Sequence, residues 1–196
     1  MKTAEEIIKE VQFLPTFLTD DDIKGMVKYA KRLKSGAILD VGTGWGKSML
    51  TWALANPANT VYTCDPGSYP IYQRWASSTD DYQDKIEDLI DKFDLHNQVR
   101  FYLGRLDQFF DVYLGYKFDI IFFDNWPELN EMNSTIFFRK VINKLKPDGY
   151  IFFRNYGRAD RKEYTQSIDE AIVDLIFEEK IGESRIYKKH KSLYKE

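Results

Sequence analysis

Apolar residues along this 196-residue chain follow two patterns that alternate over most of its length. Runs that are almost continuously apolar, β-branched or aromatic are typical of parallel strands buried on both faces, and they occupy residues 37–41, 60–64, 99–103, 118–123 and 150–153. The first run precedes a helix-compatible segment, and the others precede stretches with apolar residues at i, i+3, i+4 and i+7; these lie at 48–55, 86–93, 106–113, 138–145 and 168–175. Five β-α units in succession predict a doubly wound α/β sheet.

Both ends of the chain depart from this alternation. Two helical segments come first, and the second, at 20–33, has one apolar face that we expect to cover the sheet. At the other end, residues 177–181 and 185–189 are strand-like and are separated only by residues 182–184. Three residues are too few for a helical crossover and suit an antiparallel hairpin instead.

Length and composition indicate one globular domain. With 43% hydrophobic and 30% charged residues over 196 positions, the chain can bury a single core of ordinary size. We expect an N-terminal helical cover at 1–35, a core at 36–189 and a tail at 190–196. The net charge of −3 argues against a dedicated nucleic-acid binder, which usually has a basic balance.

The single cysteine and the N-terminal residues suggest a compartment. Cys64 has no partner for an internal disulfide and lies in a strand-like run, so we interpret it as a packing residue in a reducing environment. The chain starts without the apolar stretch of a secretory signal, and no segment approaches the roughly 20 apolar residues of a membrane span. We therefore expect a cytoplasmic protein that does not enter a membrane.

A glycine-rich turn joins the first predicted strand to its helix. Gly42, Gly44 and Gly46 alternate there, and glycine permits positive φ and close approach of backbone N–H groups to a ligand. A dinucleotide fingerprint, G-x-G-x-x-G, fails because its third glycine falls on Lys47. A phosphate-binding loop, G-x-x-x-x-G-K-[ST], fails because Val41 stands where its first glycine belongs.

The remaining pattern, D-x-G-x-G-x-G from Asp40, resembles the first motif of class I S-adenosylmethionine-dependent methyltransferases. The resemblance covers about residues 38–189 and implies a Rossmann-like, mostly parallel, seven-stranded sheet with the C-terminal hairpin and N-terminal helices described above. It implies S-adenosylmethionine as cofactor, with the glycine turn against its methionine part. Asp40 would help to hold the turn and the amino group. Trp45, Tyr69 or Trp126 would face the sulfonium, because a cation is attracted to an aromatic ring.

Two further loops are expected to contact the cofactor. Asp65 ends the second strand, and an acid there can accept hydrogen bonds from both ribose hydroxyls, although an Asp before Pro-Gly also suits a simple turn. The resemblance places the loop after the third strand beside adenine, often with an acid directly after its glycine. Here Arg105 follows Gly104, so either Asp107 or backbone groups would hold the base. Asp107 equally suits the first turn of a helix.

The segment after the fourth strand is the strongest active-site candidate. Asp124 and Asn125 follow an apolar run whose neighbour in such sheets is the first strand, where ligands bind. Asp124 would therefore lie near the transferable methyl group, where it would contact the cofactor and act as the base for a hydroxyl acceptor. Glu128 and Tyr156 are the alternative bases.

These segments look most like the small O-methyltransferase-like branch of the family. In that branch, an acid after the fourth strand can bind a divalent metal together with an acid-amide pair after the fifth. Arg154 and Asn155 stand where the branch often shows His and Asp, and Trp126 stands where a second carboxylate is expected. One carboxylate and one amide make a poor Mg²⁺ site, so we predict no required metal.

The predicted function is metal-independent O-methylation of a small molecule. A nucleic-acid-directed or other N-methyltransferase is an alternative, because residues 125–128 partly match an amide-proline-aromatic loop. A non-catalytic cofactor-binding module and, from residues 46–48, a nucleotide hydrolase are further alternatives. The basic residues at 154–162, Arg154 included, are interpreted as solvated surface. The sequence identifies neither the acceptor nor the oligomeric state.

Overall fold

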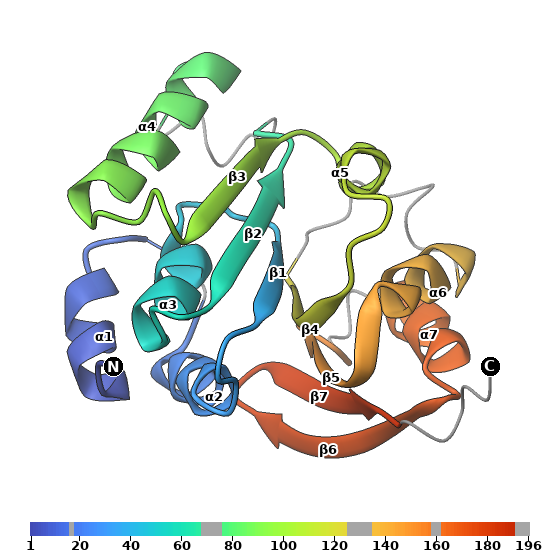
Figure 1. The fold of residues 1–196 in the computed structure, drawn as a ribbon. Coiled ribbons are helices and arrows are strands. Elements are labelled where there is room, and N and C mark those ends of the chain that lie inside the picture. Colours follow the sequence, from blue (N-terminus) through green and yellow to red (C-terminus); the bar gives the residue numbers. More distant parts are fainter. Residues whose placement is uncertain (16–17, 68–75, 125–134, 158–161, 191–196) are drawn as a thin grey trace.

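The computed structural model describes residues 1–15, 18–67, 76–124, 135–157 and 162–190. Seven strands form one sheet in the order β3-β2-β1-β4-β5-β7-β6 (Figure 1). The strands are β1 Ala37–Val41, β2 Thr60–Asp65, β3 Val99–Leu103, β4 Phe118–Phe123, β5 Leu145–Arg154, β6 Leu175–Ile181 and β7 Ser184–Lys189. β1 to β5 are parallel, and β7 pairs antiparallel with both β5 and β6. This confirms the predicted doubly wound sheet with its terminal hairpin.

Helices cover both faces of the sheet. They are α1 Ala4–Val11, α2 Asp20–Ala30, α3 Lys47–Ala55, α4 Thr79–Lys92, α5 Leu106–Val112, α6 Thr135–Asn143 and α7 Lys162–Ala171. One hydrophobic core lies between the sheet and α1 to α4, and a second lies between the sheet and α5 to α7. None of the described helices is long and apolar enough to cross a membrane.

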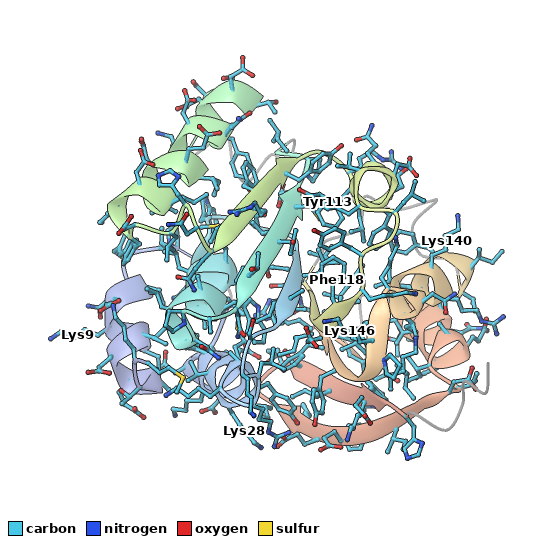
Figure 2. The ribbon with its side chains drawn as sticks, in the orientation of Figure 1. Lys9, Lys28, Tyr113, Phe118, Lys140 and Lys146 are labelled. Carbon is cyan, nitrogen blue, oxygen red and sulfur yellow. The ribbon has the colours of Figure 1, made fainter. Side chains whose placement is uncertain are left out.

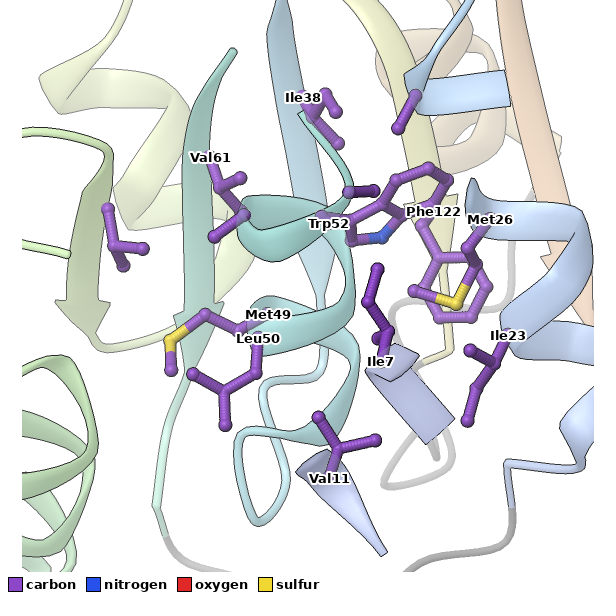
Figure 3. Close-up of a cluster of buried hydrophobic side chains, with 14 of the residues drawn as sticks. Ile7, Val11, Ile23, Met26, Ile38, Met49, Leu50, Trp52, Val61 and Phe122 are labelled. Carbon is purple, nitrogen blue, oxygen red and sulfur yellow. The ribbon is translucent and has the colours of Figure 1, made fainter. Parts of the chain in front are cut away.

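The two cores follow from the two-residue period of the strands. Phe122 and Phe152 point to the first core, where Trp52 of α3 packs edge-on against both rings (Figure 3). Phe123 and Phe153, one residue further along, point to the second core. Successive strand side chains face opposite sides, so each nearly continuous apolar run serves both cores.

The second core also contains an aromatic cluster beneath α5. Tyr62 of β2 lies with its ring centroid 5.3 Å from that of Tyr113 and 5.6 Å from that of Phe118 (Figure 2). Phe109 of α5 stacks on Tyr113 at 4.6 Å. This cluster accounts for part of the high aromatic content and fixes α5 on the sheet beside β2 and β4.

Two strands begin earlier than their apolar runs predict. The helical pattern at 138–145 ends in Leu145, but α6 stops at Asn143 and Leu145 already pairs with Phe118 as the first residue of β5. Leu175 likewise belongs to β6 and not to the helix before it. Asp148 interrupts β5 with a φ of 62°, which explains why only its second half reads as a strand.

The N-terminal cover is fastened to the terminal hairpin by Asp22. This residue is at the third position of α2, where it closes a capping box with Thr19. Its Oδ1 accepts hydrogen bonds from the backbone N–H of Glu183 at 2.9 Å and from Ser184 Oγ at 3.3 Å, both in or beside the hairpin turn. Lys28 of α2 forms an ion pair with Glu179 of β6, 2.6 Å apart (Figure 2).

Candidate functional site

The loops after β1, β2 and β4 meet at one edge of the sheet. Val41 pairs with Phe123 in adjacent strands, and the N–H of Asp124 donates to the carbonyl of Val41 at 3.0 Å. The N–H of Gly42 donates to the carbonyl of Cys64 at 3.0 Å. The sheet order reverses between β1 and β4, and ligands of open α/β sheets bind at such a reversal.

The glycine turn has the backbone conformation for which only glycine is well suited. Gly42, Gly44 and Gly46 have φ angles of 93°, 55° and 84°, all in the left-handed region. Gly46 is also the N-cap of α3, with no side-chain cap, and a Cβ there would lie 2.8 Å from the Leu89 side chain. The turn therefore presents backbone N–H groups and a helix N-terminus at the carboxyl end of β1, as predicted.

Asp65 connects the second strand directly to this turn. It is buried, its Oδ2 accepts from the N–H of Gly44 at 3.1 Å, and its Oδ1 accepts from the N–H of Gly67 at 2.8 Å. The bond from Gly67 matches the interpretation of Asp65 as an acid that forms a turn. The bond from Gly44 brings the same carboxylate to the candidate cofactor site. Both interpretations of Asp65 thus apply at once.

Asp40 lies fully buried beneath the turn. Its Oδ2 accepts from Ser48 Oγ and Thr63 Oγ1, both at 2.9 Å. Within the described parts of the chain, its Oδ1 has no hydrogen-bond partner. Burial raises the pKa of Asp40 to about 8; the two hydroxyl donors oppose this rise, and the charges of Asp124 and Asp65 add to it.

The hydroxyl of Ser48 bears on the nucleotide-hydrolase alternative. A phosphate-binding loop uses this hydroxyl as a Mg²⁺ ligand and the preceding lysine on the phosphates. Here Ser48 Oγ donates to Asp40 under the turn, and burial lowers the pKa of Lys47. The hydroxyl of Ser48 is therefore bound to Asp40 and is not presented to a phosphate-bound metal, which argues against this alternative.

Asp124 is held by two residues from the end of β5. Arg154 Nη1 lies 3.1 Å from Asp124 Oδ1 and 3.2 Å from its Oδ2, and Asn155 Nδ2 donates to Oδ1 at 3.0 Å. Only 4% of the Arg154 side chain is exposed, and its Nε lies 3.5 Å from Asp22 Oδ2. The interpretation of Arg154 as solvated surface is wrong. Arg154 lies two residues after buried Phe152, so the two side chains point to the same face of the sheet. This spacing was the available sequence signal that Arg154 is buried.

Arg105 and Asp107 lie at the neighbouring edge of the site. The N–H of Gly104 donates to the carbonyl of Asp65 at 2.9 Å, so the loop after β3 adjoins that acid. Arg105 Nε and Asp107 Oδ1 are 3.2 Å apart in a pair that is about half exposed. Asp107 occupies the first turn of α5, as its alternative interpretation expected. Contact of either residue with a base stays a prediction.

Tyr156 is turned toward α7. Its hydroxyl donates to the carboxylate of Asp169, and Arg185 lies over its ring at 4.1 Å. Burial, together with the bond to Asp169, raises the pKa of Tyr156 well above its ordinary value. A tyrosine that holds its proton so firmly is a poor base near neutral pH. The other predicted catalytic residues, Asn125 and Glu128, lie outside the described residues, as do Tyr69 and Trp126.

Tyr82 is a site residue that the sequence analysis missed. It lies in α4, is fully buried, and donates its hydroxyl to the carbonyl of Gly44 at 2.8 Å. The apolar face of that helix begins four residues later at Ile86, so its periodicity extended one turn back was an available signal. Tyr82 therefore holds the carbonyl of Gly44, whose N–H is held by Asp65.

The described residues do not form a metal site. Within the ranges that the structure covers, no three or more His, Cys, Asp or Glu side chains are grouped so that they could hold a metal ion. Asp124 meets a guanidinium and an amide N–H group instead of further oxygen ligands. The side chains that the structure describes around Asp124 therefore do not fit the divalent ion that the O-methyltransferase-like branch can bind, and independence from a metal stays a prediction.

Comparison with known proteins shows the fold. No family model matches the sequence, and no curated protein matches it significantly. Solved structures do match over nearly the whole chain. A candidate caffeoyl-CoA O-methyltransferase from Staphylococcus aureus is 17% identical, covers 96% of this chain and 92% of its own, and has a TM-score of 0.69.

Two further structures have a bound S-adenosylhomocysteine. The O-methyltransferase from Bacillus cereus is 18% identical, with coverage of 96% and 90% and a TM-score of 0.65. The methyltransferase from Podospora anserina is 14% identical, with coverage of 96% and 87% and a TM-score of 0.65. The chain thus has the Rossmann-like fold of these methyltransferases, as predicted.

Proposed function

We propose that this chain is an S-adenosylmethionine-dependent methyltransferase that methylates an oxygen of a small molecule without a divalent metal. The observation that carries the proposal is the turn after β1, which contains three left-handed glycines and is hydrogen-bonded through Gly44 to the Asp65 carboxylate of the neighbouring strand. The structures of the same fold that have S-adenosylhomocysteine bound support this choice of cofactor. A cytoplasmic location and a single functional domain stay predictions.

The residues of the turn fit this cofactor chemically. A carboxylate offers about four lone-pair positions, and the bonds from Gly44 and Gly67 occupy one on each oxygen of Asp65. In the proposed complex, the same carboxylate accepts hydrogen bonds from the ribose hydroxyls. Asp40 has a buried, unpartnered oxygen below the turn, a feature that a bound ammonium group would explain.

The charge of the site also suits this ligand. The carboxylates of Asp65 and Asp124 lie at the ends of β2 and β4, close enough to Asp40 that their charges help to raise its pKa. S-adenosylmethionine has two positive centres, a sulfonium and an ammonium. Opposite charges at short range in a partly desolvated site attract more strongly than in water.

In the proposed reaction, the bound cofactor supplies a methyl group already activated by its sulfonium charge. The chain's task is to align the acceptor oxygen behind that methyl group, and positioning of this kind can lower a barrier by roughly 7–11 kcal/mol. Asp124 contributes a fixed negative charge, because Arg154 and Asn155 occupy its oxygens. Tyr156 stays protonated, so Glu128 is the proposed base for a hydroxyl acceptor.

Binding of S-adenosylhomocysteine tests the cofactor assignment. We expect Gly44→Val to abolish binding, because a branched side chain crowds a left-handed turn. Asp65→Ala should weaken binding about a hundredfold, from two lost charged hydrogen bonds of roughly 1.5–3 kcal/mol each. Isothermal calorimetry measures both, with Asp111→Ala on the exposed face of α5 as the matched control.

Unchanged affinity in both variants would show that the cofactor site lies elsewhere. A transfer assay then separates catalysis from non-catalytic binding. Wild-type protein that binds S-adenosylhomocysteine is incubated with methyl-labelled cofactor and a panel of phenols, small carboxylic acids and RNA. Label in a phenol or acid supports the proposal, and label in RNA favours the nucleic-acid-directed alternative.

A further inference from the structure

A chain of buried charges runs from the N-terminal cover to the end of β4. The carboxylate of Asp22 is fully buried, the Arg154 guanidinium is 4% exposed, and the Asp124 carboxylate is 19% exposed. Arg154 lies between the two acids, with Nε toward Asp22 and Nη1 toward Asp124. Two carboxylates thus share one cation, and that cation belongs to the chain.

Asp22 is fixed in place independently of Arg154. Its Oδ2 accepts from the N–H of Thr19 at 3.0 Å and from Thr19 Oγ1 at 2.9 Å. Its Oδ1 accepts from Glu183 and Ser184 at the hairpin turn. The anchored carboxylate of Asp22 forms an ion pair with Arg154 Nε at 3.5 Å, while Arg154 Nη1 contacts Asp124.

Asn155 is a second described residue that contacts Asp124. It adopts a φ of 59°, and its backbone N–H donates to the carbonyl of Glu183 at 3.0 Å. Its side chain presents amide hydrogens to Asp124 and not its oxygen. Where a hard cation would need converging oxygens, Asp124 receives N–H donors from both neighbours.

We propose that Arg154 takes the place of a divalent cation at this site and acts as a positioning residue for Asp124. The guanidinium supplies a positive charge beside the carboxylate, as a metal would, and its N–H donors help to orient the acid. Asp124 is then neither a metal ligand nor the base of the reaction. It is a fixed anion at the carboxyl end of β4, where the proposed function places the methyl group. Only this position relative to the methyl group rests on the proposed function.

Manganese titration tests the displacement directly. Thermal unfolding is followed by circular dichroism with and without millimolar Mn²⁺ for the wild type, Arg154→Glu and Arg154→Glu combined with Asp124→Asn. We expect no Mn²⁺ shift for the wild type. Arg154→Glu removes the cation and places a second carboxylate beside Asp124, so it should gain a rise in Tm with Mn²⁺, and adding Asp124→Asn should reduce that rise. An Asp124-dependent Mn²⁺ shift in the wild type, or none in Arg154→Glu, would overturn the proposal.

A double-mutant cycle tests the pairing without any metal. Arg154→Met should lower Tm by roughly 6–20 °C, because it removes a buried cation from between two carboxylates. In the Arg154→Met background, Asp124→Asn should recover part of the loss, and Arg154→Lys should fall between Arg154→Met and the wild type. Arg100→Met, at an exposed arginine that donates only to backbone carbonyls, is the matched control with little change. Strictly additive shifts would contradict the pairing.

The two proposals fail in different ways. Neither the manganese titration nor the cycle needs cofactor, so both report on Arg154 and Asp124 alone. If the wild type does not bind S-adenosylhomocysteine while the cycle shows coupling, the proposed function is wrong and the role of Arg154 as resident cation stands. If the wild type binds S-adenosylhomocysteine but also shows an Asp124-dependent Mn²⁺ shift, the proposed cofactor stands and the role of Arg154 as resident cation is wrong.

Discussion

At the residue scale, Asp40 combines tight anchoring with an unfavourable charge. Two hydroxyls hold one of its oxygens, while burial and two nearby carboxylates oppose ionisation and raise its pKa to about 8. An unfolded aspartate has a pKa near 3.8. The folded protein therefore retains a proton on Asp40 over a range where the unfolded chain has lost it.

This difference sets the sign of a pH effect. Between about pH 4 and pH 8 the folded state binds more protons than the unfolded state, so the free energy of unfolding falls as pH rises. Above pH 8, Asp40 is ionised in the folded protein as well, and the loss of stability is complete. Asp40→Asn removes that loss. As pH rises from 5 to 9, the free energy of unfolding of the variant should therefore increase by about 2–4 kcal/mol relative to that of the wild type.

Urea unfolding at pH 5, 7 and 9 measures this gain. Asp107→Asn, at an exposed position in the first turn of α5, is the matched control and should track the wild type at each pH. A stability difference between Asp40→Asn and the wild type that does not vary with pH would show that Asp40 is ionised in the folded protein throughout.

At the element scale, the hairpin turn and α2 are locked together. Gly182 has a φ of 55°, and a Cβ at this position would lie 2.5 Å from Asp22 Oδ1. Any side chain there must adopt a strained backbone and also push on the carboxylate that binds the turn and faces Arg154. The β6–β7 connection and the N-terminal cover thus depend on one small residue.

Gly182→Ala should therefore lower the free energy of unfolding by about 2–4 kcal/mol, from left-handed strain and overpacking combined. Chemical denaturation measures the loss. Gly115→Ala is the control, since a Cβ at Gly115 has no atom within 4 Å, and it should be close to neutral. Equal effects of the two substitutions would mean that the turn relaxes away from Asp22 at little cost.

At the scale of the whole molecule, the site lies at the edge of the one sheet that both cores share. β1 and β4 contribute residues to both cores and end at the glycine turn and at Asp124. Global unfolding separates these ends, so a ligand that binds between them stabilises the entire fold by mass action.

We expect S-adenosylhomocysteine at about 100 times its Kd to stabilise the protein by about 2.7 kcal/mol, which is roughly 5–10 °C in Tm for a chain of this size. Differential scanning fluorimetry measures the shift. Mg-ATP should produce none, because Ser48 is bound to Asp40. The shift should also vanish in Asp65→Ala, and a comparable shift with Mg-ATP would instead favour a nucleotide-binding loop.

Much of the fold was readable from local pattern. The order of strands and helices, the hairpin and the glycine turn all depend on neighbouring residues, and each was predicted within a few positions. Strand beginnings were harder, because Leu145 continues a helical period and yet pairs with Phe118. Tertiary pairing overrides a local period wherever the two conflict.

The spacing of apolar residues and the backbone freedom of glycine are local properties of the sequence. They were enough to predict a doubly wound sheet with glycines and acids at the carboxyl ends of its strands. The pairing of charged side chains became visible only in the folded structure. Asp22 and Arg154 are 132 positions apart and form a buried ion pair with Asp124 beyond it, and that contact changed a residue interpreted as solvated surface into the cation of the site. The partners of a charge are set by packing between distant elements, which no local period encodes.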